Sequence, residues 1–269
     1  MTQNKTKTII SHAISGIQSD VLLSAADEGK RVITFDEIRK RSGLSHERLR
    51  PVLVDLVKRE WLKRINRGLY MIVPVEAGKE RLFTESSFII AKHMMPDGAI
   101  SHWSAFNYHG FTDQLPKDVY MSGMRRMRNR EVMGLRYTFV FMGEDIFFGH
   151  EDIWVENEKV RITDAERTLI DALWMPKHCG GMSLILESLD SNSVSKLDSQ
   201  KLNDYLQKLD RTVLFKRLGF IADLLGWKIP HTEAWLKMID KNYNLLDPDG
   251  PKKGRVDSKW RLKINMDIG

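Results

Sequence analysis

The side chains of this sequence best suited to a chemical task are basic and polar groups between residues 39 and 67. Lys and Arg neutralise the phosphates of nucleic acids, and Arg, His and Ser also hydrogen-bond to base edges. Side chains at the start of a recognition helix usually contact bases, whereas flanking cations set the position on the duplex. The candidates for base reading are Ser45, His46, Arg48 and Arg50, and those for phosphate contact are Arg39, Lys40, Arg41, Lys63, Arg64 and Arg67.

Two short helices joined by a tight turn would position these side chains. Thr34 and Glu37 have the spacing of a capping box, which predicts a helix that begins at Phe35. Gly43 predicts its end, because glycine readily adopts the left-handed conformation beyond a helix. Ser45 then offers the N-cap of a second helix. Apolar residues at helical spacing mark the buried face of that helix: Leu49, Val52, Leu53, Leu56 and Val57.

A basic hairpin is predicted after the second helix. Its strands are residues 62–65 and 69–73, and the turn between them consists of Asn66, Arg67 and Gly68, a segment rich in residues that tolerate positive φ. Upstream, apolar residues at helical spacing predict a further helix from about residue 7 to residue 27. Three helices followed by a basic hairpin form a winged helix-turn-helix, which indicates binding of duplex DNA.

Pro51 conflicts with a simple second helix. Proline lacks a backbone donor and clashes with the preceding turn, which costs about 3 kcal/mol or more in a helix interior. Two alternatives follow from this conflict. Either the helix begins near residues 48–50, with Pro51 in its first turn, or it begins earlier and is kinked at Pro51. A late start would place His46 in the turn and would move the set of base-reading residues by one turn.

The net charge of the chain is concentrated in this N-terminal segment. Residues 1–73 contain 14 Lys and Arg against 8 Asp and Glu, whereas residues 74–269 contain 28 of each kind. A surplus of cations confined to one small domain is what neutralisation of DNA phosphates requires. The alternatives are that the cations only keep the domain in solution, or that the winged helix is a protein docking module.

The length and composition suit two globular domains in a reducing compartment. The chain has 269 residues, of which 42% are hydrophobic. We expect a winged-helix domain at residues 1–75 and an α+β domain at residues 76–269. Cys179 has no flanking charge cluster and is interpreted as a packed side chain. The N-terminus lacks the apolar region of a signal peptide and no run is long enough to cross a bilayer, so we expect a cytoplasmic protein.

The second domain combines helical and strand patterns, which predicts a small mixed sheet covered by helices. A capping box of Thr163 and Glu166 is expected to open one of the helices. The other predicted elements are helices at 82–95 and 101–110, strands at 118–122, 135–142 and 153–162, mostly helix at 183–239 with a loop at 190–196 and a helix end at Gly226, and a closing hairpin at 243–265.

A second basic surface is one interpretation of the segment between the first two strands of this sheet. Four arginines lie close together there: Arg125, Arg126, Arg128 and Arg130. Guanidinium groups on one loop could follow a phosphate backbone or bind an acidic partner. The alternative is a solvated hairpin tip whose charge is balanced by Glu131 and by acidic residues between 144 and 158.

Signals for catalysis are weak. His102 and His109 lie seven residues apart but have no further ligand at metal-binding spacing, and we interpret them as packed, hydrogen-bonded side chains. Asp171 is interpreted as a solvated or salt-bridged carboxylate, and Glu166 as a capping residue. The chain contains no phosphate-binding loop and no dinucleotide fingerprint. The nearest signal is the nuclease-like pattern Pro248, Asp249, Asp257, Ser258 and Lys259, which also fits a tight turn.

Several fragments resemble a known family when they are taken in order. WLKRINRGLYMIVP at 61–74, ISHWSAFNYHG at 100–110, ITDAERTLIDAL at 162–173, and LLDPDGPKKG with KWRLKIN at 245–265 are similar to segments of the AbiEi-type antitoxins. These proteins of type IV toxin-antitoxin systems are also described as transcriptional regulators of viral defence systems. The resemblance extends from about residue 8 to residue 266.

The resemblance implies a function that composition and spacing do not. It implies a repressor whose winged helix binds inverted repeats at the promoter of its own operon. It also implies that the larger domain antagonises a toxin of the nucleotidyltransferase class, typically without forming a stable complex. We therefore expect a DNA-binding regulator and antitoxin with no catalytic activity, metal or cofactor. The alternatives are a Mg²⁺-dependent nuclease targeted by the winged helix, and a regulator that responds to a ligand or protein without a toxin partner.

Overall fold

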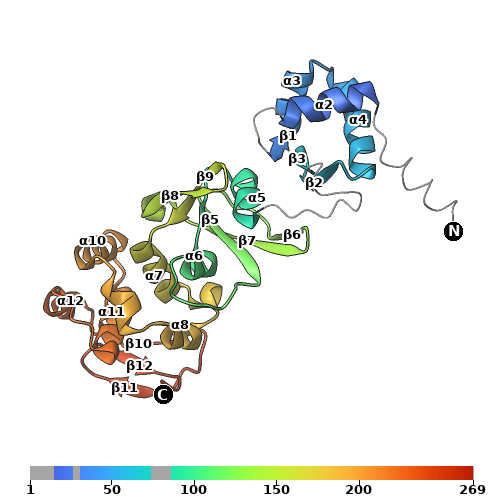
Figure 1. Ribbon diagram of the computed structural model, residues 1–269. Helices are drawn as coiled ribbons and strands as arrows, with labels where there is room; N and C mark the ends of the chain where they lie inside the picture. The colour runs from blue at the N-terminus through green and yellow to red at the C-terminus, as the bar shows by residue number, and fades with distance from the viewer. Residues whose placement is uncertain (1–14, 27–30, 74–85, 269) are drawn as a thin grey trace. The chain divides into compact units, whose positions relative to one another are not determined.

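The computed structural model describes residues 15–26, 31–73 and 86–268 (Figure 1). These residues divide into two compact units. The N-terminal unit comprises the described residues up to Pro96 together with Trp154–Lys159, and the C-terminal unit comprises Asp97–Ile153 and the described residues from Val160 onward. The predicted domain boundary at residues 75 and 76 lies outside the described residues, as do residues 7–14 and 27 of the first predicted helix and residues 82–85 of the helix predicted at 82–95.

The N-terminal unit consists of helices packed against a three-stranded antiparallel sheet. The sheet has the order β1-β3-β2, so β3 pairs with both of its neighbours. Helices α2, α3 and α4 enclose a core with the sheet, to which Ile33, Ile38, Leu53 and Leu56 contribute fully buried side chains. The elements are α2 (Gly16–Ala26), β1 (Val32–Thr34), α3 (Phe35–Ser42), α4 (His46–Lys58), β2 (Leu62–Asn66), β3 (Leu69–Ile72) and α5 (Ser87–Met94).

The start and end of α3 confirm the sequence prediction. The Thr34 hydroxyl accepts a hydrogen bond from the Glu37 backbone N–H at 3.2 Å, and the Glu37 carboxylate accepts one from the Thr34 N–H at 2.8 Å. This reciprocal pair is the capping box that the sequence predicted. Gly43 ends the helix with a φ of 66°, in the left-handed region that glycine tolerates.

Helix α4 begins at His46, so the alternative of a late start was wrong. Ser45 caps the helix by accepting a hydrogen bond from the Arg48 N–H, and the Leu49 N–H already donates to the Ser45 carbonyl at 3.0 Å. Pro51 is the sixth residue of this continuous helix. Its side chain is exposed, which keeps the ring away from the packed face formed by Leu49 and Leu53. The cap and the first helical turn are thus complete before proline removes a donor.

The C-terminal unit contains a six-stranded mixed sheet of the order β6-β7-β5-β4-β9-β8, except that the end of β8 and the start of β9 fall within Trp154–Lys159 and so belong to the N-terminal unit. β5 runs parallel to β7 and antiparallel to β4, and β4 runs parallel to β9. Figure 1 shows α6 beside β5, and the two elements are in contact. The sheet strands are β4 (Ala99–Ile100), β5 (Asp118–Gly123), β6 (Arg130–Val132), β7 (Leu135–Phe141), β8 (His150–Val155) and β9 (Glu158–Thr163).

Helices and a second, smaller sheet complete this unit. The small sheet has the order β10-β12-β11, in which β11 and β12 form an antiparallel hairpin and β10 pairs in parallel with β12. Its elements and the helices are α6 (His102–Tyr108), α7 (Ala165–Trp174), α8 (Met182–Ser188), α9 (Ser191–Ser195), α10 (Ser199–Leu209), α11 (Thr212–Leu225), α12 (Thr232–Met238), β10 (Asn244–Leu245), β11 (Arg255–Asp257) and β12 (Leu262–Ile264), with short 3-10 turns at Glu144–Ile146 and Pro176–Cys179.

Three predictions for this unit need correction. The single strand expected at 153–162 is a pair of strands, β8 and β9, because Glu156 adopts a φ of 51° and the chain reverses there. The loop expected at 190–196 contains helix α9, because Asp190 caps it by accepting a hydrogen bond from the Ser193 N–H at 2.6 Å. The closing hairpin was predicted, but β10, the third strand of the sheet that contains it, was not. The mixed α+β character of the unit is confirmed.

No helix among the described segments is long and apolar enough to cross a membrane.

Candidate nucleic-acid interface

The residues predicted to read bases are all exposed, but they lie on two sides of α4. Ser45, His46, Arg48 and Arg50 have solvent-accessible side chains. Successive residues of a helix are rotated by about 100°. His46 and Arg50 therefore lie on the same side, whereas Arg48 points roughly 160° away from Arg50 around the helix axis. The sequence-predicted set is split by the geometry of the helix.

A groove in the N-terminal unit gathers cations from the helix and from the hairpin. It has a volume of about 490 Å³ and lies between the start of α3, one side of α4 and the β2–β3 hairpin. Of the predicted residues, it brings together His46 and Arg50 from α4 with Arg64 and Arg67 from the hairpin. The complete lining is Phe35, Asp36, His46, Arg50, Val54, Arg64, Arg67, Gly68 and Tyr70.

Backbone contacts fix the hairpin relative to the helices. The Gly68 carbonyl accepts a hydrogen bond of 2.7 Å from the Phe35 N–H, which satisfies one of the free donors at the start of α3. Gly68 has a φ of 73°, and a Cβ added there would lie 3.7 Å from the Phe35 Cβ. A β-bulge between Arg64 and Asn66 leaves Ile65 unpaired in the ladder and redirects the strand. The hairpin tip is therefore held in place before any ligand arrives.

The side chain of Arg64 is oriented by its own strand. Its Nε donates to the Asn66 carbonyl at 3.3 Å, across the bulge. The His46 ring lies 4.9 Å from the Phe35 ring on the opposite wall of the groove, at an interplanar angle of 58°. These contacts hold a basic group on each wall of the groove.

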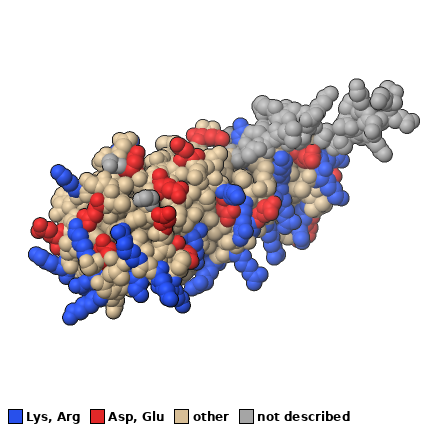
Figure 2. Space-filling model, turned by 90° about the horizontal axis from the view of Figure 1, so that it is seen from below, with Lys and Arg blue, Asp and Glu red and all other residues tan. Residues whose placement is uncertain are grey.

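The other predicted phosphate-binding residues lie outside the groove lining. Arg39 is exposed and lies 3.5 Å from the Asp36 carboxylate, one turn away on α3. Lys40 is exposed, and Arg41 and Lys63 are half-buried. Figure 2 shows Lys and Arg side chains closely spaced over the N-terminal unit, whereas over the C-terminal unit they alternate with Asp and Glu. The cations therefore form a basic surface around the groove, and four of the predicted residues line it.

Sequence reasoning missed the uncharged walls of the groove. Phe35 and Tyr70 are half-buried, and Val54 is an exposed valine on α4 with 55% of its surface accessible. Val54 follows Arg50 by four residues, so the helical spacing that identifies the buried face also places Val54 outside it. Tyr70 pairs with Arg64 across the hairpin, a contact that depends on the register and the bulge.

Helix α4 is anchored by a polar contact on the side away from the groove. The Asp55 carboxylate accepts hydrogen bonds from the Gln18 amide of α2 and from Arg59, the latter at 2.9 Å. This contact complements the packing of Leu49 and Leu53 against α2 and α3. It keeps α4 in a single position beneath its exposed side chains.

Comparison with known proteins agrees with this geometry. Residues 20–73 match the family described as "Transcriptional regulator, AbiEi antitoxin". These residues belong to the AbiEi family. The matched segment contains α3, α4 and the hairpin, and it therefore contains the groove and all ten predicted DNA-binding residues.

The similarity of the fold extends beyond the family match. The crystal structure of the RV2827C protein from Mycobacterium tuberculosis superposes with a TM-score of 0.70, covering 93% of this chain and 92% of that chain at 13% sequence identity. At this identity the likeness concerns the fold alone. No curated protein matched the sequence. The chain thus shares its architecture with a solved structure that differs from it at most positions.

The arginine segment after β5 is less uniform than predicted. Arg125, Arg126 and Arg128 are exposed on the loop after β5. The Arg126 guanidinium lies 4.2 Å from the centre of the exposed Phe141 ring. Arg130 instead begins β6, where its Nε is buried without a hydrogen-bond partner among the described residues. Three arginines, and not four, therefore project from this loop.

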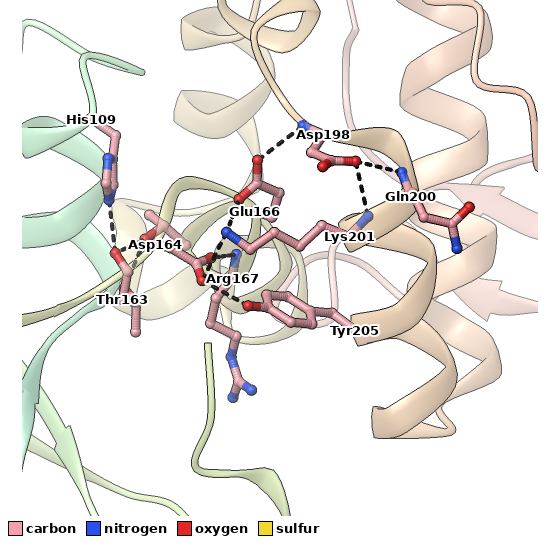
Figure 3. Close-up of polar contacts among 10 residues, drawn as sticks. His109, Thr163, Asp164, Glu166, Arg167, Asp198, Gln200, Lys201 and Tyr205 are labelled. Atoms are coloured by element: carbon pink, nitrogen blue, oxygen red, sulfur yellow. Dashed lines mark hydrogen bonds and ion pairs between the residues drawn. The ribbon is translucent and has the colours of Figure 1, made fainter. Parts of the chain in front are cut away.

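The residues at the start of α7 form a polar cluster that the sequence analysis misassigned (Figure 3). The N-cap of α7 is Asp164, whose carboxylate accepts a hydrogen bond from the Arg167 N–H at 2.8 Å. The predicted capping box of Thr163 and Glu166 was wrong. The Glu166 carboxylate lies 2.9 Å from the Lys201 ammonium and accepts a hydrogen bond from the Asp198 N–H. Glu166 therefore connects α7 to α10 instead of closing its own helix.

Lys201 is the centre of this cluster. Its ammonium lies 2.9 Å from Glu166 and 3.2 Å from Asp164, and the Tyr205 hydroxyl donates to Asp164 at 2.8 Å. Partial burial alone would lower the pKa of Lys201, but the hydrogen bonds and charges of Glu166 and Asp164 raise it above its usual value. The carboxylates are fully engaged by these neighbours, which is the arrangement of a structural joint between helices.

A second charged pair lies inside this unit. Arg167 and Asp171 are both buried, and the Arg167 Nε lies 2.9 Å from the Asp171 Oδ1. Burial raises the pKa of Asp171 to about 6, although the Arg167 charge opposes this shift. The salt-bridged interpretation of Asp171 is confirmed, and the solvated one was wrong.

The two histidines and the cysteine have packing roles. His102 is buried and hydrogen-bonds to Ser101, and burial lowers the pKa of His102 well below its usual value. The His109 ring nitrogen lies 2.7 Å from the Thr163 carbonyl. Cys179 is fully buried, and burial raises the pKa of its thiol. The interpretation of Cys179 as a packed side chain is confirmed.

The nuclease-like pattern does not assemble into a metal site. Lys259 pairs with Asp223 at 2.6 Å, and the Asp257 carboxylate accepts a hydrogen bond from the Trp260 N–H at 2.7 Å. The side chain of Asp247 accepts a hydrogen bond from the Asp249 N–H. Within residues 15–26, 31–73 and 86–268, His, Cys, Asp and Glu side chains form no group of three or more that could hold a metal ion. These residues serve the turns around β11.

Proposed function

We propose that this protein is a cytoplasmic transcriptional repressor that binds duplex DNA through a winged helix-turn-helix. The observation that carries the proposal is the groove between α4 and the β2–β3 hairpin, which is lined by His46, Arg50, Arg64 and Arg67. Cations on both a helix and an adjacent hairpin match the two-part contact of a winged helix with DNA. The surplus of positive charge in residues 1–73 and the family of residues 20–73 support the same conclusion.

The roles of the side chains follow from their positions. Helix α4 enters the major groove, and Ser45 and Arg48 at its start contact base edges. The hairpin acts as the wing. Cations elsewhere on the unit contact phosphates and set the position of the protein on the duplex: Arg39, Lys40, Arg41 and Lys63.

The operator is proposed to contain inverted repeats at the promoter of the protein's own operon. This part of the proposal is supported by the AbiEi family of residues 20–73. Two copies bound to the half-sites of such an operator would lie about 34 Å apart if the half-sites are separated by one helical turn.

A binding experiment tests the repressor. Affinity for the DNA upstream of the gene is measured by fluorescence anisotropy over a series of salt concentrations, with a scrambled duplex for comparison. The wild type is expected to prefer the upstream DNA, and a variant with Arg48→Ala and Arg50→Ala is expected to lose most of its affinity. A variant with Lys252→Ala and Lys253→Ala removes two exposed cations from the C-terminal unit and serves as the control. Equal affinity of the wild type for both duplexes would contradict a sequence-specific repressor.

We further propose that the C-terminal unit is an antitoxin. It would antagonise a toxin of the nucleotidyltransferase class encoded beside it, without forming a stable complex. The family of residues 20–73 supports an antitoxin, and the fold of the C-terminal unit provides a second domain for that task. Co-expression tests this proposal: the protein should restore growth to cells that express the neighbouring gene, while the two proteins elute separately in gel filtration. Growth arrest that persists despite soluble protein would contradict it.

A further inference from the structure

We propose that the groove between α4 and the hairpin is a clamp for the phosphodiester backbone of one DNA strand, held by Arg50, Arg64 and Arg67. This inference rests on the proposed function and assigns the groove a specific part of the duplex. It changes the role of Arg50, which the sequence analysis placed among the base-reading residues. It also assigns the cavity of about 490 Å³ to an anionic ligand, a linear phosphodiester.

The position of the groove beside the recognition helix favours contact with the DNA backbone over contact with base edges. The major groove of B-DNA is about 12 Å wide, so a helix inserted into it has one sugar-phosphate strand on each side. Arg48, which lies on the other side of α4 from the groove in the protein, is placed to meet base edges. His46 and Arg50 instead lie on the side of α4 that faces the hairpin, because they line the same groove as Arg64 and Arg67. The strand that passes on this side must run between helix and hairpin.

The charges on the two walls suit a phosphodiester. Arg50 comes from the helix wall, and Arg64 and Arg67 come from the hairpin wall, so a strand between the walls meets guanidinium groups from both directions. Arginine presents several donors in a planar fork that fits phosphate oxygens. Asp36 is the acidic residue of the lining, and it lies 3.5 Å from Arg39, which offsets its charge at the rim.

The clamp is formed in advance of binding. The 2.7 Å hydrogen bond from the Phe35 N–H to the Gly68 carbonyl fixes the hairpin tip against α3. The hydrogen bond of Arg64 Nε to the Asn66 carbonyl leaves the terminal nitrogens of that guanidinium available to another acceptor. Groups that are already positioned lose less conformational freedom when a ligand binds.

Single substitutions separate a phosphate contact from a base contact. Arg50→Gln, Arg64→Gln and Arg67→Gln are each measured in the full chain against the upstream DNA and against a scrambled duplex. Each substitution should weaken binding to both duplexes by the same factor, on the order of tenfold. Each should also lower the slope of log affinity against log salt by about 0.9. If Arg50→Gln weakens binding to the upstream DNA only, Arg50 reads a base and the clamp is overturned.

Neutral DNA linkages then test whether the arginines share one strand. Methylphosphonate groups, which remove a single phosphate charge, are placed one at a time along the upstream duplex. At one or two adjacent linkages, the neutral group should lower the affinity of the wild type about tenfold. The affinity of a double variant with Arg50→Gln and Arg64→Gln should hardly change at the same linkages. Strictly additive losses at every linkage would overturn the clamp. Unchanged thermal unfolding of the double variant shows that the fold is intact.

The failure of the clamp and the failure of the repressor are distinguishable. If the wild type binds the upstream and scrambled duplexes equally, the sequence-specific repressor fails. The arginine and methylphosphonate measurements still report on the clamp in that case, because a backbone contact is present on any duplex.

Discussion

The grooved surface of the N-terminal unit and the interior of the C-terminal unit hold positive charge in opposite ways. In the N-terminal unit, Arg48, Arg50, Arg64 and Arg67 are exposed, and three of the four line an open groove. In the C-terminal unit, Arg167, Lys216 and Arg217 are buried. A cation at the surface can meet a phosphate at little cost, whereas a buried cation requires partners within the fold. The distribution of charge therefore separates the cations that can bind a ligand from those that hold the structure together.

Lys216 is an example of a cation that holds the structure together. It is fully buried in α11, and its ammonium lies 2.9 Å from the Asp240 carboxylate, 2.7 Å from the Asn244 side chain and 2.5 Å from the Asn242 carbonyl. Arg217, the next residue, donates to the carbonyls of Leu173 and Leu245. Both cations connect α11 to the chain around β10, so they specify packing and are not available to an external anion.

The largest effect is expected from breaking the Lys216 contacts. Lys216→Ala removes the buried cation and its hydrogen bonds to Asp240, Asn242 and Asn244, so the free energy of unfolding should fall by about 3–5 kcal/mol. Urea denaturation measures this change. Lys216→Met, which retains most of the volume, is the control and should cost less. If the alanine variant loses less than about 1 kcal/mol of unfolding free energy, Lys216 is dispensable for stability. That result would contradict the structural role assigned to the buried cations of this unit.

Removing exposed cations should have the converse effect. Arg50→Gln with Arg64→Gln should lower affinity for the upstream DNA about 100-fold, because two charge-assisted contacts are lost. The free energy of unfolding should change by less than about 0.5 kcal/mol, since neither side chain contributes to the core. Anisotropy and urea denaturation on the same preparation give both values. A stability loss as large as the loss in binding would mean that these arginines are structural.

One half-buried charge cluster in the N-terminal unit extends the comparison. Glu158 lies 2.8 Å from Lys92 and 3.0 Å from His93 of α5, and only 14% of its side chain is exposed. The hydrogen bond from His93, followed by that from Lys92, lowers the pKa of Glu158 to about 2. A lowered pKa in the folded state stabilises the protein above the unfolded value of 4.5, and this contribution is lost as the pH falls towards 2.

Glu158→Gln removes this pH-dependent contribution. The variant should be less stable than the wild type by about 1–2 kcal/mol at pH 7, allowing for screening of the partly exposed partners. The difference should shrink when urea denaturation is repeated between pH 4.5 and pH 3. A difference that is constant over this range would show that the Glu158 charge does not stabilise the unit.

The smallest effect is expected at the cap of α3. Thr34→Ala removes the acceptor for the Glu37 N–H and should cost about 1 kcal/mol. Thr34→Ser keeps the hydroxyl and should retain most of the stability. DNA affinity should change little at temperatures where both variants are folded, because Thr34 does not line the groove. If affinity falls with the alanine variant alone, the cap also positions the DNA-binding residues.

Sequence reasoning succeeded where structure is determined by neighbours along the chain. Thr34, Glu37, Gly43 and Ser45 predicted the limits of α3 and the start of α4, because capping depends on residues three or four positions apart. The turn at Asn66 to Gly68 was also predicted from local chemistry. The same local logic failed at Thr163 and Glu166, where the spacing of a capping box was present but Asp164 took the cap.

Contacts between distant segments could not be predicted in this way. Glu166 binds Lys201 through the packing of α7 against α10, a pairing with no signal in either segment. In the candidate site, the sequence identified Arg50, Arg64 and Arg67 as separate cations. Their shared groove depends on the β-bulge and on the hydrogen bond from Phe35 to Gly68, which fix the hairpin against the helices. The sequence therefore predicted which residues could bind DNA, but it did not predict that these three arginines line one groove.

The salt dependence of binding to the upstream DNA is the most direct test of the central claim that the exposed cations of the N-terminal unit contact DNA. The slope of log affinity against log salt is compared for the wild type, for a variant with Arg50→Gln, Arg64→Gln and Arg67→Gln, and for a variant with Lys252→Gln, Lys253→Gln and Arg255→Gln in the C-terminal unit. Each triple variant removes three exposed positive charges. We expect the first variant to lower the magnitude of the slope by about 3 and the second to leave the slope unchanged. An equal or larger change in the second variant would contradict the assignment of DNA binding to the N-terminal unit.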